Sequence, residues 1–157
     1  MAGRAGRGSV PGRVVLQTYN PEHFSILAAR DQDAKRFYAQ EITFRKALNY
    51  PPFSRIIQLR IAGKHKDRTG QVAMELGAAC SALRQGSKSF GRSLEVLGPI
   101  PAPLARIAQE HRWQILIKGK RVGTLHQFVR QLMQDRSALF NQRQAKVQID
   151  VDPFFMM

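Results

Sequence analysis

Two adjacent prolines, Pro51 and Pro52, divide this sequence of 157 residues into two parts of different character. Proline cannot continue a helix and biases the preceding residue toward extended backbone, so a helix that approaches Tyr50 must end there. Before this break, a short apolar run is followed by a long stretch of helical character. After it, strand-like and helix-like segments alternate. We therefore expect a domain boundary near residues 49–53, with one domain over residues 1–48 and another over residues 49–157.

The part after the two prolines predicts a four-stranded sheet. Apolar residues alternate over residues 54–63, 93–100, 112–119 and 145–153, and they recur at three- and four-residue spacing over residues 66–85 and 122–140. The proline-punctuated residues 99–111 are expected to form a connection. The resulting β-α-β-β-α-β order, with right-handed crossovers, folds most simply into a ferredoxin-like sheet with both helices on one face. The fold class is therefore α/β (α+β), and the same design is common among ribosomal proteins.

The part before the prolines predicts one strand and two helices. Residues 12–19 carry a β-branched run typical of a short buried strand. Residues 23–48 are helical in character, with a break near residues 30–33 where Asp31 or Asp33 could cap the second helix.

The charge of the chain points to an anionic partner. Its 25 Lys and Arg residues against 11 Asp and Glu residues give a net charge of +14 and a pI near 11.1. Nucleic acid is the first candidate, because neutralised phosphates release counterions, and an anionic membrane surface or an acidic protein is the second. A merely solvated basic surface gives the same charge.

The DNA-binding residues that we predict form a phosphate-tracking strip of Arg106, Arg112, Lys118 and Lys120. Trp113 could serve as a stacking platform beside them. Its alternation in phase with the apolar residues of its strand favours a place in the core instead.

Several function classes are not supported by the sequence. Cys80 is the only cysteine, so an internal disulfide and a cysteine-rich zinc site are excluded. We expect it to be a buried, non-reactive residue of a helix. The four histidines show no metal-like pairing, and Asp150 and Asp152 are read as solvent-facing carboxylates. With no signal peptide or long apolar run, we expect a cytoplasmic monomer without a membrane partner and without a bound metal.

The opening residues, MAGRAGRG, place Arg4 and Arg7 three positions apart among small residues. Such a pair can hold nucleotide phosphates, because the guanidinium fork matches phosphate oxygens and small neighbours allow close backbone approach. On composition alone, an Arg/Gly-rich tail that attracts nucleic acid is the simpler interpretation.

The order of motifs along the chain favours the nucleotide interpretation. GRAGRG and the strand after it resemble the sixth conserved motif of superfamily 2 helicases, although the glutamine of that motif would fall before Met1. Five further blocks resemble the C-terminal part of the primosomal protein N′ (PriA) family of bacterial replication-restart helicases. They are QEITFRK at 40–46, NYPPF at 49–53, EVLGPIPAP at 95–103, RWQILIK at 112–118 and DVDP at 150–153.

The resemblance implies that residues 1–48 are the end of the second RecA-like lobe and that the remainder is the C-terminal domain of the family. Family members are ATP-driven 3′-to-5′ DNA helicases that act at stalled forks. Arg4 and Arg7 would then face the ATP γ-phosphate, with Gly3 and Gly6 needed for close packing.

The sequence departs from the family in ways that limit its chemistry. The phosphate-binding loop, the acidic pair for magnesium and the zinc-binding cysteines of the family are absent from these 157 residues. ATP, magnesium and zinc are therefore implied only for the full-length family. We expect no ATP hydrolysis from this chain by itself, which would be a truncated product or a fragment of a longer reading frame.

The resemblance also implies partners for the C-terminal domain: forked and single-stranded DNA at the nucleoid, the acidic C-terminal tail of the single-stranded DNA-binding protein, and other primosome proteins. Arg121, with Val122 and Leu125 beside it, stands where the tail-binding arginine of the family would be. An ordinary basic turn is the equal alternative for KGKRVG. For the whole chain, a free-standing basic module that binds RNA or DNA without catalysis is the alternative function.

Overall fold

The computed structural model describes residues 13–153, which divide into two units at residues 44 and 45. Gly3, Arg4, Gly6 and Arg7 lie outside the described residues, so their predicted nucleotide-binding role stays a prediction.

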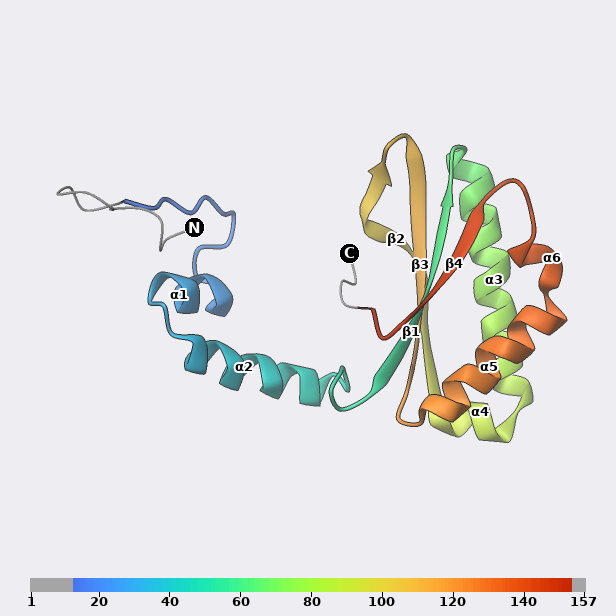
Figure 1. Ribbon diagram of the computed structural model, residues 1–157, viewed down its shortest axis with the longest axis horizontal. Coiled ribbons are helices and arrows are strands. Elements are labelled where there is room, and N and C mark those ends of the chain that lie inside the picture. Colours follow the sequence, from blue (N-terminus) through green and yellow to red (C-terminus); the bar gives the residue numbers. More distant parts are fainter. Residues whose placement is uncertain (1–12, 154–157) are drawn as a thin grey trace. The chain divides into compact units, whose positions relative to one another are not determined.

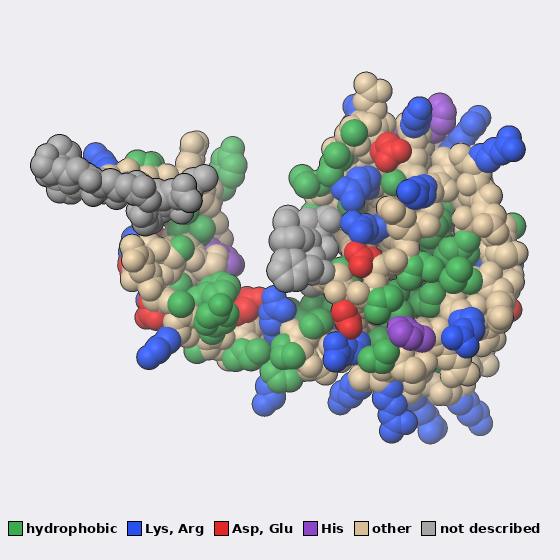
Figure 2. Space-filling model, viewed as in Figure 1, with side chains coloured by type: hydrophobic (Ala, Val, Ile, Leu, Met, Phe, Trp, Pro, Cys, Tyr) green, Lys and Arg blue, Asp and Glu red, His purple; other side chains and the backbone are tan. Residues whose placement is uncertain are grey.

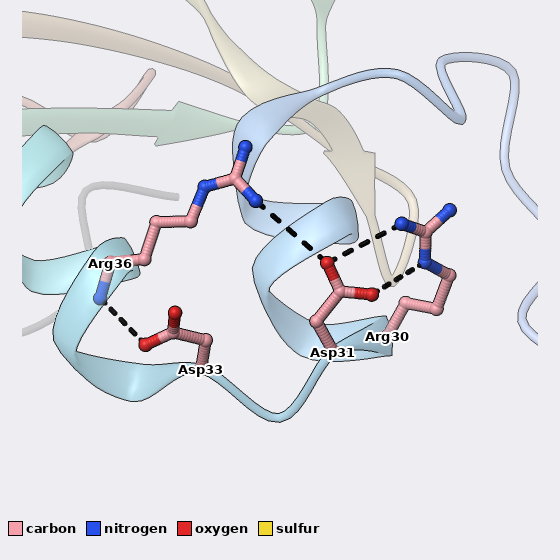
Figure 3. A network of polar contacts seen from close by, with 4 residues as sticks. All are labelled: Arg30, Asp31, Asp33 and Arg36. Atoms are coloured by element: carbon pink, nitrogen blue, oxygen red, sulfur yellow. Dashed lines mark hydrogen bonds and ion pairs between the residues drawn. The ribbon is translucent and has the colours of Figure 1, made fainter.

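The first unit contains the two predicted helices, α1 (Phe24–Arg30) and α2 (Ala34–Ala47), and the second of these continues past the division. The break between them is where the sequence places it. The Asp33 carboxylate accepts a hydrogen bond from the backbone N–H of Arg36 at 2.9 Å, which confirms Asp33 as a cap. Asp31 instead accepts a hydrogen bond from Nε of Arg30 at 2.7 Å and lies 3.8 Å from Nη1 of Arg36 (Figure 3). The hydrogen bond from Arg30 lowers the pKa of Asp31.

The predicted strand at residues 12–19 is wrong for the residues that the structure describes. Residues 13–19 form no strand or helix, Val15 is 80% exposed, and Tyr19 is fully exposed. A strand exists only when its backbone groups pair with a neighbour, and no described segment pairs with this one. The β-branched run therefore has the composition of a strand without a sheet to join.

The second unit is a four-stranded antiparallel sheet with helices on one side (Figure 1). The strand order is β2-β3-β1-β4. The elements are β1 (Arg55–Gly63), α3 (Lys66–Gly86), α4 (Lys88–Ser93), β2 (Leu94–Ile107), β3 (Glu110–Gly119), α5 (Val122–Asp135), α6 (Ser137–Phe140) and β4 (Lys146–Val151). The predicted β-α-β-β-α-β order is confirmed. The short helix α4 was not predicted, and the helix expected over residues 122–140 is divided between α5 and α6.

The core lies between the sheet and helices α3 and α5. Inward-facing residues of β1 and β3 pack there with Leu76 and Phe128, and the ring of Phe128 meets that of Phe90 edge-on at 5.2 Å. Trp113 packs against this core, where a Cβ added to Gly70 would lie 3.2 Å from its ring. Trp113 is half-buried, so its predicted packing against the core is confirmed, but it is not fully buried.

Strand β2 is longer than predicted, because residues that were expected to form a connection continue it to Ile107. The strand tolerates its prolines because it lies at the edge of the sheet and its pairing with β3 shifts register twice. Gly98 has a φ of +97°, and an added Cβ would lie 2.8 Å from the carbonyl oxygen of Gln114. Only glycine fits this position without strain.

The sheet face without helices also differs from expectation, because its centre is buried and contains both polar and apolar residues. The pattern of β1 predicts cover on one face only, but Gln58 is fully buried on the other face. Its Nε2 donates to Oε1 of Gln114 at 2.7 Å, and Arg60 pairs with Asp150 at 2.8 Å. Ile56 and Leu116 are buried on this face as well, so polar pairs and apolar contacts hold it together, where the helix side is held by apolar packing.

Candidate anion and nucleic-acid interface

The four predicted DNA-binding residues do not form one strip. Arg106 and Arg112 lie at the β2–β3 hairpin, whereas Lys118 and Lys120 lie at the opposite end of β3. Lys118 follows Arg112 by six positions of extended strand, a span of about 20 Å. The structure therefore places two cationic groups at the two ends of one strand.

The hairpin group is open. Arg106 is exposed and is paired in register with His111, so side-chain alternation directs it to the face opposite that of Arg112. The neighbouring Leu104 and Ile107 are also exposed. Arg112 is half-buried, so the charge that this end exposes to a phosphate backbone is mainly that of Arg106.

The other end forms a hollow, which we name the basic pocket. The ends of α3, α4 and β3, the starts of β2 and α5, and the segment before β1 all contribute to it. It is lined by Asn49, Arg84, Gly91, Arg92, Ser93, Leu94, Glu95, Lys118, Gly119, Lys120 and Arg121. Five of these side chains are cationic and one is acidic. Figure 2 shows the Lys and Arg side chains that gather along the lower edge of this unit, where Figure 1 places α4 and the β3–α5 turn.

Arg84 holds one wall of the basic pocket in place. Its Nε donates to the carbonyl oxygen of Leu94 at 2.7 Å, and its Nη2 donates to that of Gly91 at 3.3 Å. These two bonds tie the end of α3 to the α4–β2 junction. Gly119 allows close packing beneath the junction, because an added Cβ would lie 2.6 Å from Cδ2 of Leu94. The side chain of Arg84 therefore serves the shape of the basic pocket more than its charge.

Lys118 forms the buried floor of the basic pocket. Its side chain is 4% exposed, and its Nζ lies 2.9 Å from the carboxylate of Glu95, its partner in the β2–β3 register. The same Nζ donates to the carbonyl oxygen of Leu48 at 3.0 Å and lies 4.7 Å from the centre of the Tyr50 ring. The ammonium therefore has partners inside the protein, and its contact with DNA stays a prediction.

Arg121 lies at the rim of the basic pocket, where it is the N-cap residue of α5. It is exposed and makes no side-chain capping bond, so its guanidinium faces solvent beside the positive end of the helix. Leu125, which the sequence pairs with Arg121 for partner binding, is 1% exposed and belongs to the core. Val122 is 41% exposed and is the apolar neighbour at the surface.

Sequence reasoning missed Asn49, Arg84 and Arg92 as parts of this site. Arg92 falls in the unpredicted helix α4, and Arg84 lies on a helix whose pattern reports only its core face. No local signal marks them, since the basic pocket exists only after four separate segments have come together.

The described part of the chain gives no support for a metal site or a membrane-spanning helix, and its cysteine is buried. Among residues 13–153, no three or more His, Cys, Asp or Glu side chains could together hold a metal ion. Burial raises the pKa of Cys80 to about 12, as expected for a thiol within the core. No helix in the same range is long and apolar enough to cross a membrane.

Comparison with known proteins agrees with the resemblance seen in the motifs. Residues 46–154 match the model of the primosomal protein N C-terminal domain. A replication restart protein PriA from Synechocystis is 40% identical over 118 residues, covering 75% of this chain and 14% of that protein. The proteins of the same name from Treponema pallidum and Bacillus subtilis are 35% and 29% identical, covering 98% and 100% of this chain and 22% and 19% of their own lengths.

The chain thus spans about a fifth or less of the length of these relatives. The matched residues 46–154 include the whole sheet and every residue that lines the basic pocket. The chain therefore belongs to the family of primosomal protein N C-terminal domains found in replication restart proteins PriA.

Proposed function

We propose that this chain supplies the C-terminal DNA-binding and partner-binding part of a replication-restart helicase. In this role it binds DNA at stalled or branched forks and the acidic tail of the single-stranded DNA-binding protein, and so supports primosome assembly. Unwinding driven by ATP belongs to the full-length protein. Residues 13–48 then correspond to the end of a RecA-like lobe, and the sheet to a ferredoxin-like domain.

The observation that carries the partner-binding role is the basic pocket with Arg121 at its rim. A peptide that ends in an apolar residue presents a carboxylate next to a hydrophobic side chain. Arg121 can pair with such a carboxylate through two parallel hydrogen bonds, while Val122 offers exposed apolar surface beside it. An acidic residue further along the peptide would meet Lys120, which lines the same pocket next to Arg121.

The DNA-binding role rests on charge at the open hairpin end. Arg106 is exposed there, Arg112 is half-buried on the opposite face, and the chain carries a net charge of +14. Contacts of this kind neutralise phosphates and position a protein on a nucleic acid, but they read no sequence. Recognition of a fork would therefore depend on its shape.

The experiment that tests this proposal compares two ligands on the variant Arg121→Ala. Loss of a hydrogen bond to a charged group should weaken binding of an acidic, Phe-terminated peptide by about tenfold or more. Forked DNA should lose less than about threefold, because many phosphate contacts remain. Arg130→Ala is the matched control, since Arg130 is exposed on the same helix but does not line the basic pocket.

Fluorescence anisotropy of labelled peptide and labelled DNA gives both affinities under one set of conditions. A peptide with an amidated C-terminus should bind the unaltered chain as weakly as the free peptide binds Arg121→Ala. Equal losses for peptide and DNA would show that Arg121 is only part of a general basic field, and the partner-binding role would fail.

A further inference from the structure

Glu95 is the only acidic side chain among the residues that line the basic pocket in the described part of the chain. It stands directly opposite Lys118 in the β2–β3 register, which explains why its carboxylate lies 2.9 Å from the buried ammonium. The two members of this pair differ in exposure, because Lys118 is 4% exposed and Glu95 is 52% exposed. The positive charge is thus covered while the negative charge faces the solvent side of the hollow.

This asymmetry changes what the basic pocket can accept. Lys118 already has a carboxylate, a carbonyl oxygen and an aromatic ring as partners, so it offers little to an incoming anion. Arg84 is likewise engaged with two backbone carbonyl groups. The cations left for a ligand are Arg92, Lys120 and Arg121, and Glu95 lies in the same wall as the first of these.

We propose that Glu95 is a specificity residue that keeps nucleic-acid backbone out of the basic pocket and reserves it for a peptide with one terminal carboxylate. This inference rests on the proposed function. A phosphate backbone carries a charge at every nucleotide, so a strand that follows the pocket must bring phosphates close to Glu95. A single carboxylate can pair with Arg121 and avoid that contact. Discrimination therefore comes from a repulsive group as well as from an attractive one.

The test is the variant Glu95→Gln, which keeps the shape of the side chain and removes its charge. Its affinity for single-stranded DNA should rise by about fivefold or more, because the carboxylate no longer repels phosphates and no longer neutralises Lys118. The slope of log affinity against log salt concentration should steepen by about one or two units as additional phosphates make contact. Binding of the acidic, Phe-terminated peptide should change by less than about twofold, because the peptide carboxylate does not face Glu95.

Two controls show whether DNA affinity depends on where the removed negative charge lies or only on the net charge of the chain. Glu75→Gln removes one negative charge from the exposed face of α3, outside the basic pocket, and should raise DNA affinity by less than about twofold. Adding Arg121→Ala to Glu95→Gln should abolish the gain in DNA affinity, because the gain depends on the basic pocket. An equal gain for Glu75→Gln and Glu95→Gln, or a gain that survives Arg121→Ala, would overturn the proposal.

Ser93→Asp tests the same claim without touching the Glu95–Lys118 pair, should Glu95→Gln disturb folding. Ser93 is exposed and lines the basic pocket. A second acid there should lower DNA affinity by no more than about twofold, because DNA already avoids the site. A loss of about fivefold or more would show that DNA occupies the basic pocket, and would overturn the proposal.

These measurements also distinguish failure of this inference from failure of the proposed function. Failure of the unaltered chain to bind the peptide would contradict the partner-binding role, while the DNA measurements would still decide whether Glu95 excludes nucleic acid. Peptide binding together with an unchanged DNA affinity in Glu95→Gln would leave the proposed function standing and overturn this inference alone.

Discussion

The two ends of β3 carry the same kinds of side chain but arrange them differently. At the hairpin end, Arg106 is exposed on β2, the edge strand of the sheet, and Arg112 is half-buried on the opposite face. At the other end, the basic pocket has walls from four segments, a floor whose lysine is neutralised internally, and Arg121 at its rim. An open edge suits a long ligand with repeated charges, whereas a walled pocket suits a ligand that ends there. Under the proposed function, shape as well as charge therefore decides which anion each end binds.

The largest effect is expected from a change that removes the support of the basic pocket. Phe128→Ala should lower the free energy of unfolding by about 3–5 kcal/mol, because the ring is fully buried against Phe90 of the pocket-forming helix α4. Chemical denaturation monitored by Trp113 fluorescence measures this loss. Met133→Ala, on the exposed side of the same helix, is the control and should cost much less. Similar losses for the two variants would contradict the core described here.

A smaller effect, confined to the basic pocket, is expected from Gly119→Ala. The added Cβ would meet Leu94 and the carbonyl oxygen of Ser93, so the wall must move, at a cost of about 1–3 kcal/mol. Peptide affinity should fall while DNA affinity at the hairpin end is kept. Gly123→Ala is the matched control, because an added Cβ there meets nothing within 4 Å and favours the helix. Unchanged thermal stability and peptide affinity in Gly119→Ala would show that the close packing is not required.

The double variant Arg106→Ala/Arg112→Ala tests the hairpin end alone. Loss of two phosphate contacts should reduce the slope of log DNA affinity against log salt concentration by about 2, with no change in peptide binding. Anisotropy titrations over a range of salt concentrations measure the slope. A parallel loss of peptide affinity would mean that the two ends act as one surface.

The smallest effect is expected in the first unit. The hydrogen bond from Arg30 lowers the pKa of Asp31 below its ordinary value of 3.8, so the unfolded chain binds this proton more readily than the folded chain. The pairing is therefore fully present above that ordinary value and is lost as the pH falls through the lowered pKa. Helicity measured by circular dichroism should be the same in Asp31→Asn and the unaltered chain near neutral pH, since the pair is exposed. A resolved difference at pH 7 would contradict this.

The sheet and the helices that cover it were predictable because the sequence carries both the alternation of strands and the three- and four-residue spacing of helices. Alternating residues such as Trp113, Ile115 and Ile117 mark one face of β3, and the spacing of Leu125, Phe128 and Leu132 marks the buried side of α5. Residues 13–19 have comparable strand-forming composition and form no strand. Composition reports what a segment can bury, whereas a strand also requires a neighbour to pair with.

The candidate site was predictable only in part. Arg121 could be found because a recognised motif surrounds it, but Leu125, which is predicted to bind the partner with it, lies in the core, as its helical spacing indicates. Arg84, Arg92 and Glu95 come together only through the β2–β3 register and the unpredicted helix α4. Long-range register leaves no local signal, so these residues needed the structure.

The claim that the two ends of β3 bind two different ligands is tested most directly by a competition experiment on the whole chain. Forked DNA is titrated into protein saturated with the acidic, Phe-terminated peptide, at about 0.15 M salt so that charges about 20 Å apart are largely screened. If the peptide occupies the basic pocket and DNA the hairpin end, DNA affinity should change by less than about twofold. An apparent Kd for DNA that rises in proportion to the peptide concentration would show that both ligands share one site.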